Sequence, residues 1–193
     1  MEFSELVAKN RSYRRFYQER RIAGETLAGL VNAARLTASA RNMQPLKYVT
    51  VTGAETCARI FETLAWAGYL TDWDGPSEGE RPAAYIVMCN DARLAAESRW
   101  DQGIAAQTIL LGAVEAGLGG CIVGAFRKEE ASRILELPQY LTPVLVLALG
   151  VPKENVTIVE PASGDIRYYR KPDGTHCVPK RPLEEVLIGE KSV

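Results

Sequence analysis

The chain has 193 residues, of which 47% are hydrophobic, and its 23 Lys and Arg residues balance 24 Asp and Glu residues to a formal net charge of −1. A chain of this size forms one ordinary domain with a real hydrophobic core. Because no basic excess exists, nucleic acid is not an expected partner, and an anion site has to come from a local cluster of charges.

Four cysteines and one histidine are spread along the chain. Since the cysteines form no CxxC pair, neither a zinc site nor a disulfide framework is expected, and no metal ligand is assigned. This cysteine usage fits a reduced, intracellular compartment. The N-terminal sequence MEFSELVAKNRS has no apolar signal core, so we expect a cytoplasmic protein.

Apolar residues recur at helical spacing in three segments of the first half of the chain. These predicted helices span residues 1–9, 24–36 and about 55–66. A polar loop over residues 39–45 leads into a predicted strand over 46–52. The following segment, GYLTDWDGPSEGERP (residues 68–82), is rich in Gly, Pro and acidic residues, which is typical of a mobile lid or of an ordinary surface loop.

The most apolar stretch, residues 101–124, has the sequence DQGIAAQTILLGAVEAGLGGCIVG. Its helical part is apolar nearly all the way round, so we expect burial on every side, against this chain or against its copy in a second subunit. The uncharged run, residues 102–114, is too short and too polar to span a bilayer, and no membrane partner is expected. Gly117, Gly119 and Gly120 are expected to end the helix before a strand over 121–123.

The remaining elements of the compact part are a helix over roughly 128–136 and strands over 83–89 and 144–149. The strand over 83–89 is apolar on both faces, which is typical of a central strand. Alternating strands and helices predict a sheet with helices on both faces.

From Pro152 onward the sequence predicts an extended arm. It contains a predicted turn at Pro172-Asp173-Gly174, a short strand near Val178, and an apolar patch of Leu183, Val186, Leu187 and Ile188. Since the arm has no core of its own, we expect it to pack on a second subunit. We therefore expect one domain over residues 1–193, with a compact part (1–151) and a C-terminal dimer arm (152–193).

Three basic or polar clusters lie far apart in the sequence: residues 11–15 (RSYRR), residues 39–44 (SARNMQ) and Lys180-Arg181. Arg11, Ser12 and Arg14 can converge from a turn, and two guanidinium groups with a hydroxyl suit a phosphate. A solvated charged turn is the other interpretation of this cluster. Asn42 and Gln44 could meet the edge of a heterocycle or could simply turn the chain.

Three further residues or pairs invite a catalytic or nucleotide-binding interpretation. Gly119-Gly120 follow a helix and precede a strand, which excludes the dinucleotide-binding fingerprint; a tight turn that brings the amides near Val123 and Gly124 close to a ligand is expected instead. His176 has no Ser, Cys or Asp partner at an interpretable spacing, which favours a structural or surface histidine over a general base. Cys121 has apolar neighbours and is expected to be packed.

Taken together, five segments resemble the nitroreductase family of FMN-dependent oxidoreductases, in the right order and over nearly the whole chain. They are NRSYRRF, SARNMQP, DQGIAAQTILLGAVEAGLGGCIVGAF, LVLALGVP and PKRPLEEVL. The resemblance implies an α+β fold with a mixed sheet flanked by helices. It also implies an intertwined homodimer with an extended C-terminal arm and two FMN molecules at the interface, each touched by both chains.

The resemblance assigns site residues by position. It implies that the FMN phosphate and nearby flavin edge are held by Arg11, Ser12 and Arg14, with Lys180 and Arg181 from the tail. It implies that Ser39, Ala40 and Asn42 reach the flavin from the other subunit, that main-chain groups around Val123 and Gly124 face flavin N5, and that Arg81 lies near N1 and O2. One departure is Leu46, where the family usually has an aromatic residue behind the flavin.

The implied activity is hydride transfer from NAD(P)H through FMN to nitroaromatic, quinone or similar small acceptors, in a ping-pong mechanism. Because the cofactor carries the chemistry, no side chain is assigned as catalytic. Two alternatives remain open: a specialised enzyme of the same fold, of flavin-fragmenting or reductive dehalogenating type, and a non-catalytic flavin-binding module. The preference between NADH and NADPH also stays open.

Overall fold

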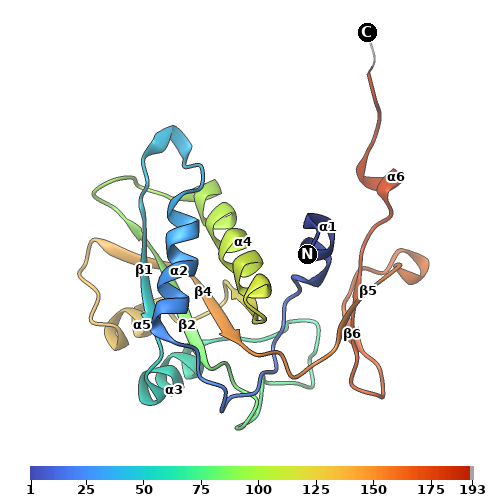
Figure 1. The fold of residues 1–193 in the computed structure, drawn as a ribbon, viewed down its shortest axis with the longest axis horizontal. Coiled ribbons are helices and arrows are strands. Elements are labelled where there is room, and N and C mark those ends of the chain that lie inside the picture. The colour runs from blue at the N-terminus through green and yellow to red at the C-terminus, as the bar shows by residue number, and fades with distance from the viewer. Residues whose placement is uncertain (192–193) are drawn as a thin grey trace.

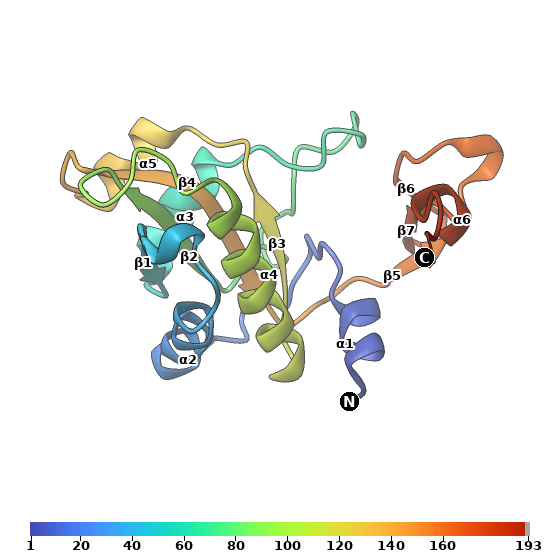
Figure 2. The ribbon, with the colours of Figure 1, turned by 90° about the horizontal axis from the view of Figure 1, so that it is seen from above.

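A four-stranded sheet with the order β1-β2-β4-β3 forms the centre of the computed structural model, which describes residues 1–191 (Figures 1 and 2). Its strands are β1 (Leu46–Val51), β2 (Ala84–Asp91), β3 (Gly119–Val123) and β4 (Leu141–Gly150). Neighbouring strands in this sheet pair antiparallel. The strand β2 is buried along its whole length, which confirms the prediction of a central strand.

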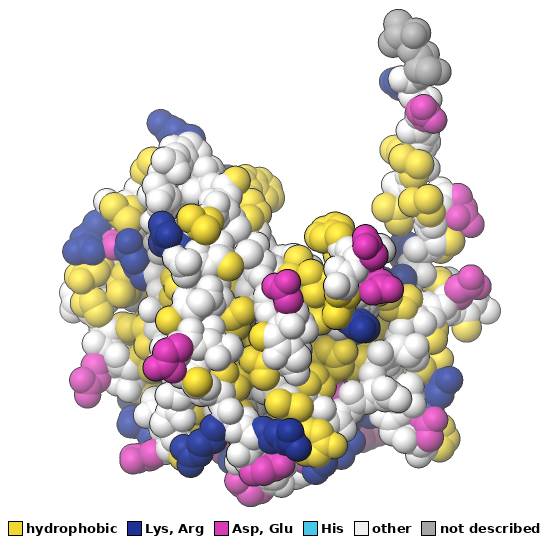
Figure 3. Space-filling model, in the orientation of Figure 1, with side chains coloured by type: hydrophobic (Ala, Val, Ile, Leu, Met, Phe, Trp, Pro, Cys, Tyr) yellow, Lys and Arg dark blue, Asp and Glu magenta, His cyan; other side chains and the backbone are white. Residues whose placement is uncertain are grey.

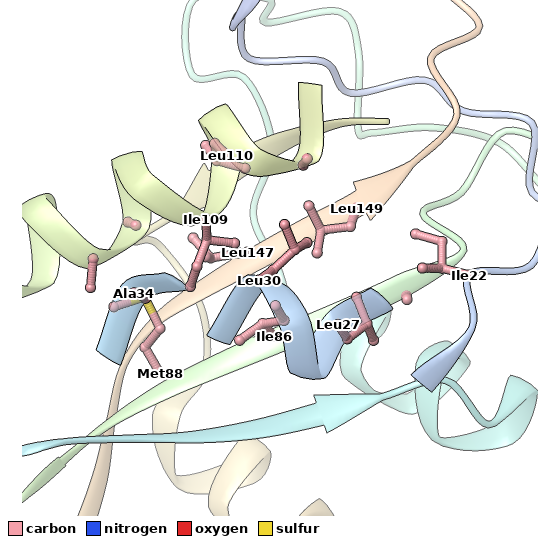
Figure 4. Close-up of a cluster of buried hydrophobic side chains, with 14 residues drawn as sticks. Ile22, Leu27, Leu30, Ala34, Ile86, Met88, Ile109, Leu110, Leu147 and Leu149 are labelled. Carbon is pink, nitrogen blue, oxygen red and sulfur yellow. The ribbon is translucent and has the colours of Figure 1, made fainter. Parts of the chain in front are cut away.

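Helices cover both faces of this sheet, as predicted. One face carries α2 (Gly24–Arg35) and α4 (Arg99–Glu115), and the other carries α3 (Ala54–Thr63) and α5 (Lys128–Ile134). The alternation of side chains along β2 separates two cores, because successive residues of a strand point to opposite faces. Ile86 and Met88 pack under α2 and α4 (Figure 4), whereas Tyr85 and Val87 pack under α3 and α5.

The central helix α4 is buried on one side within a single chain. Ala106 and Ile109 are fully buried against the sheet, but Trp100 is 73% exposed and Ile104 is 40% exposed. Burial on every side, as the sequence predicts, is therefore not met within one chain. The helix ends as predicted, with Gly117 in the left-handed conformation at φ +74°.

Gly119 and Gly120 do not form the tight turn that the sequence suggests, because both already belong to β3. Their small size serves close packing instead. A Cβ atom on Gly120 would lie 2.6 Å from Leu110 Cδ2 of α4 and 2.8 Å from the Ala148 carbonyl oxygen of β4. Glycine at this position therefore lets α4 and the sheet approach one another closely.

The C-terminal arm stands apart from the body, with α1 (Phe3–Lys9) between it and α4 (Figures 1 and 2). It contains a second sheet with the order β5-β7-β6. Its elements are β5 (Val156–Val159), the 3-10 turn η2 (Ala162–Gly164), β6 (Tyr169–Arg170), β7 (His176–Pro179) and α6 (Leu183–Val186). The predicted turn at 172–174 and the strand near Val178 are confirmed, and β5 pairs parallel with β7, so the fold contains both pairing directions.

The end of the arm exposes the predicted apolar patch in a single chain (Figure 3). Leu183, Val186 and Leu187 are exposed, and Ile188 is 96% exposed. Within residues 1–191, no helix has both the length and the apolar character that crossing a bilayer requires.

Candidate cofactor site

The N-terminal loop of residues 11–15 is fixed to the edge strand β3. Ser12 forms a parallel β-bridge with Gly120, and the Tyr13 amide donates to the Gly120 carbonyl oxygen at 3.0 Å. A Cβ atom on Gly119 would lie 2.6 Å from the Tyr13 ring, so glycine is what allows the loop to pack directly on the strand. The loop is therefore held at a defined place beside the end of α4.

Glu154 ties the same loop to the arm. Its carboxylate, with 2% of the side chain exposed, accepts hydrogen bonds from the backbone amides of Arg14 (2.5 Å) and Arg15 (3.2 Å) and from Arg170 Nη2 (3.1 Å). A buried carboxylate is stable only with such donors around it. Glu154 could not be predicted from the sequence, because a single Glu after a strand shows no pattern that reveals its partners.

A cavity of about 260 Å³ opens between this loop, α4 and the arm. It is lined by Asn10, Arg11, Ser12, Arg14, Gln107, Leu110, Ile122, Tyr168, His176, Val178 and Lys180. The structure thus brings together four residues of the predicted phosphate cluster, from opposite ends of the chain.

The donors of this cavity suit a phosphate. Three cationic side chains and two hydroxyl-bearing side chains, Ser12 and Tyr168, line it, and no acidic side chain is among its described lining residues. Arg11 donates to the Val7 carbonyl oxygen through Nη2 at 2.9 Å, while its buried Nε has no partner among the described residues. An unpaired buried N–H donor is costly, and an anion in the cavity would supply an acceptor. These residues therefore fit the phosphate group of a cofactor such as FMN.

A second cavity of about 250 Å³ adjoins the first, because Arg14 and Ile122 line both. Its other lining residues are Ala65, Trp66, Ala67, Gly68, Cys121, Val123, Gly124 and Ala125. Val123 and Gly124 lie here, so the predicted main-chain contacts are next to the cationic cavity. Cys121 is a buried free thiol, and burial raises its pKa, as a packed cysteine requires.

The loop of residues 39–44 lies elsewhere in the single chain. It contains the 3-10 turn η1 (Ala40–Asn42), and Ser39 lines a separate cavity of about 440 Å³ with Asp101. The buried Asp101 carboxylate accepts hydrogen bonds from Ser39 Oγ at 2.5 Å and from the Ala40 amide at 2.9 Å. Arg41, Asn42 and Gln44 all adopt positive φ, a strained conformation that persists where surrounding contacts fix it.

Two residues that the resemblance places at the flavin lie outside both adjoining cavities. Arg181 is paired with Glu185 at 2.9 Å on the exposed arm. Arg81 stacks 4.2 Å from the centre of the Phe61 ring and faces Glu78 at 3.3 Å, beside a different cavity of about 480 Å³. Within one chain, the geometry gives neither residue a place beside Arg14.

Residues 7–151 match the family model described as the nitroreductase family. The chain belongs to the nitroreductase family. It is 30% identical over 161 residues, 80% of this chain and 80% of the relative, to a protein of Methanothermobacter thermautotrophicus named "Putative NADH dehydrogenase/NAD(P)H nitroreductase".

Solved nitroreductase structures share the fold. A nitroreductase family protein from Streptococcus pneumoniae has a TM-score of 0.68 at 20% identity, covering 99% of this chain and 100% of its own. An FMN-dependent nitroreductase from Clostridium difficile has a TM-score of 0.63 at 21% identity, covering 79% of this chain and 88% of its own. The family match confirms the resemblance and the shared fold confirms the α+β class, both predicted from the sequence, and a member of this family with such relatives is an oxidoreductase.

Proposed function

We propose that this nitroreductase binds FMN and passes hydride from NAD(P)H to nitroaromatic, quinone or similar small acceptors. The observation that carries the proposal is the convergence of Arg11, Ser12, Arg14 and Lys180 on one cavity that adjoins Val123 and Gly124. The name of the Clostridium difficile relative, an FMN-dependent nitroreductase, and the NAD(P)H nitroreductase name of the archaeal relative support the same cofactor and co-substrate.

The chain's own residues divide the work of binding. The guanidinium groups of Arg11 and Arg14 donate to phosphate oxygens, Ser12 adds a hydroxyl donor, and Lys180 adds a positive charge from the arm. The backbone at Val123 and Gly124 would face the flavin ring, and FMN would supply the two-electron chemistry when bound. NAD(P)H and the acceptor would occupy this site in turn, which would make the mechanism ping-pong.

A homodimer completes the proposed site. The exposed Trp100 and Ile104 on α4, and the exposed apolar end of the arm, are surfaces that a second copy would bury. Within one chain the loop of residues 39–44 lies away from the cationic cavity, so we assign Ser39, Ala40 and Asn42 to the flavin bound by the other subunit.

Substitution of the cationic residues tests the site. Arg14→Ala and Lys180→Ala should each weaken FMN binding by about 10- to 150-fold, the cost of a lost charge-assisted hydrogen bond of about 1.5 to 3 kcal/mol. Arg181→Ala is the matched control, because its pairing with Glu185 predicts a change of less than about threefold. Fluorescence titration of the flavin-free protein measures all three. Wild-type affinity in both Arg14→Ala and Lys180→Ala would rule out this phosphate site.

Steady-state kinetics test the order of events. A ping-pong enzyme gives parallel double-reciprocal lines when NAD(P)H is varied at several fixed concentrations of a nitroaromatic or quinone acceptor. Intersecting lines would show that both substrates bind together, which contradicts the alternate use of one site.

A further inference from the structure

His176, the one histidine of the chain, lies inside the cationic cavity and not on the surface. It sits in the middle strand of the arm sheet, paired with Val156 of β5 and Arg170 of β6, and its backbone amide donates to the Asn155 carbonyl oxygen at 2.8 Å. Only 1% of the residue is exposed. Its ring therefore has a fixed position relative to the loop that carries Arg14.

The contact with Arg14 determines the protonation of the ring. Arg14 Nη1 lies 3.3 Å from His176 Nε2. A guanidinium group can only donate, so Nε2 has to be the acceptor and carries no hydrogen. The neutral ring then carries its hydrogen on Nδ1, which is buried and has no partner among the described residues.

The charges around the ring agree with a neutral imidazole. Arg14 of the N-terminal loop and Arg170 of β6 are its charged neighbours, Lys180 lines the same cavity, and Glu154 is already engaged by Arg170. Burial first, and then the Arg14 and Arg170 guanidinium groups, lower the pKa of His176 to about 4.

Three groups of the protein contact the Arg14 guanidinium. Besides His176, the Ser12 carbonyl oxygen accepts from Nη1 at 3.3 Å, and the Tyr168 ring lies 5.0 Å from the guanidinium carbon. Tyr168 in turn packs on His176 with ring centroids 5.3 Å apart. A long flexible arginine loses much of its rotamer freedom in such a cage before any ligand arrives.

We propose that His176 is a positioning residue for the phosphate end of the flavin site, holding Arg14 ready by accepting a hydrogen bond from it through Nε2. The inference rests on the proposed FMN site and adds a residue that no phosphate-binding pattern in the sequence includes. It predicts that His176 acts on ligands through their phosphate, and only while Arg14 is present.

The tautomer can be read directly on the flavin-free wild-type protein. With one histidine, the imidazole nitrogens of ¹⁵N-labelled protein give one unambiguous pair of NMR signals. We expect hydrogen on Nδ1, none on Nε2, and a ring that stays neutral at pH 6.5, where a free histidine is half protonated. Hydrogen on Nε2, or a protonated ring at that pH, would overturn the proposal. This result does not depend on whether FMN is the cofactor.

Ligand binding separates positioning from general stability. In His176→Phe the ring volume is kept and the acceptor is lost, and FMN affinity should fall about tenfold, while riboflavin, which lacks the phosphate, binds as it does to wild type. In His176→Gln the amide oxygen can replace Nε2, and FMN affinity should stay within about threefold. Equal losses for FMN and riboflavin, or no loss for FMN, would overturn the proposal.

A double-mutant cycle tests the dependence on Arg14. In an Arg14→Ala background, adding His176→Phe should change FMN affinity by less than about twofold, because the residue it positions is gone. The same tenfold loss in both backgrounds would show that His176 acts independently of Arg14. A wild-type protein that binds neither FMN nor riboflavin would instead contradict the proposed function, and the tautomer measurement would still decide the His176–Arg14 contact.

Discussion

Gly120 lies where α4, β4 and the N-terminal loop meet. A methyl group there would come within 2.6 Å of Leu110 Cδ2 and 2.8 Å of the Ala148 carbonyl oxygen, and the backbone oxygen cannot move aside easily. The same residue bridges Ser12, so this close packing also sets the position of the proposed phosphate loop.

Substitution of this glycine tests the packing. Gly120→Ala should lower the free energy of unfolding by about 1 to 3 kcal/mol, the usual cost of overpacking a core. Gly124→Ala in the same segment is the control, because its Cβ would meet Leu145 at an ordinary 3.8 Å, and we expect a change below about 0.5 kcal/mol. Urea unfolding of the flavin-free proteins measures both. Equal stability of Gly120→Ala and wild type would refute the packing argument.

At the scale of residues, side-chain chemistry could be predicted and long-range partners could not. Arg11, Ser12 and Arg14 stand together in the sequence and suit an anion by type. Glu154 and His176 act on the same loop from about 140 or more positions away, and single residues of these types leave no local pattern. Asp101 had a weak signal, as an acid at the start of an otherwise apolar helix.

Substitutions on the two faces of α4 should have different effects. Ile109→Ala should lower the free energy of unfolding by about 2 to 5 kcal/mol, because Ile109 is fully buried in the core beneath the helix. Ile104 is 40% exposed in a single chain, and Ile104→Ala should instead weaken dimer formation. Chemical unfolding at two protein concentrations, together with sedimentation velocity, separates the effects.

The control lies within this pair of variants. Both remove the same atoms from the same helix, so propensity changes cancel and the difference reports the surroundings. A dimer unaffected by Ile104→Ala would leave this face outside the subunit interface.

At the scale of elements, periodicity predicted α2 and α3 because their apolar residues repeat on one face, and the two-sided apolar run of β2 predicted a central strand. The strands β5 and β6 were not predicted, because they have only four and two residues, and these residues are exposed or half-buried. The tight turn predicted at Gly119-Gly120 was wrong for a physical reason. Glycine is used both in turns and where two backbones approach closely, and the sequence alone does not distinguish the two.

At the scale of the whole molecule, the layered body could be predicted, because β2 is apolar on both faces and needs a helix layer on each. The placement of the arm could not be predicted, because nothing in a single chain covers its apolar end at residues 183–188. The proposed dimer explains three features together: the exposed face of α4, the exposed end of the arm, and the separation of residues 39–44 from the cationic cavity.

The most direct test of an FMN-dependent nitroreductase is the visible absorption spectrum of the FMN-reconstituted protein under anaerobic conditions. NADH or NADPH is added first, and a nitroaromatic or quinone acceptor second. We predict that the flavin bands bleach with the nucleotide and return with the acceptor. Bands that persist after both nucleotides would indicate a flavin-binding module without reductase activity, and a protein that takes up no FMN would contradict the proposed cofactor site itself.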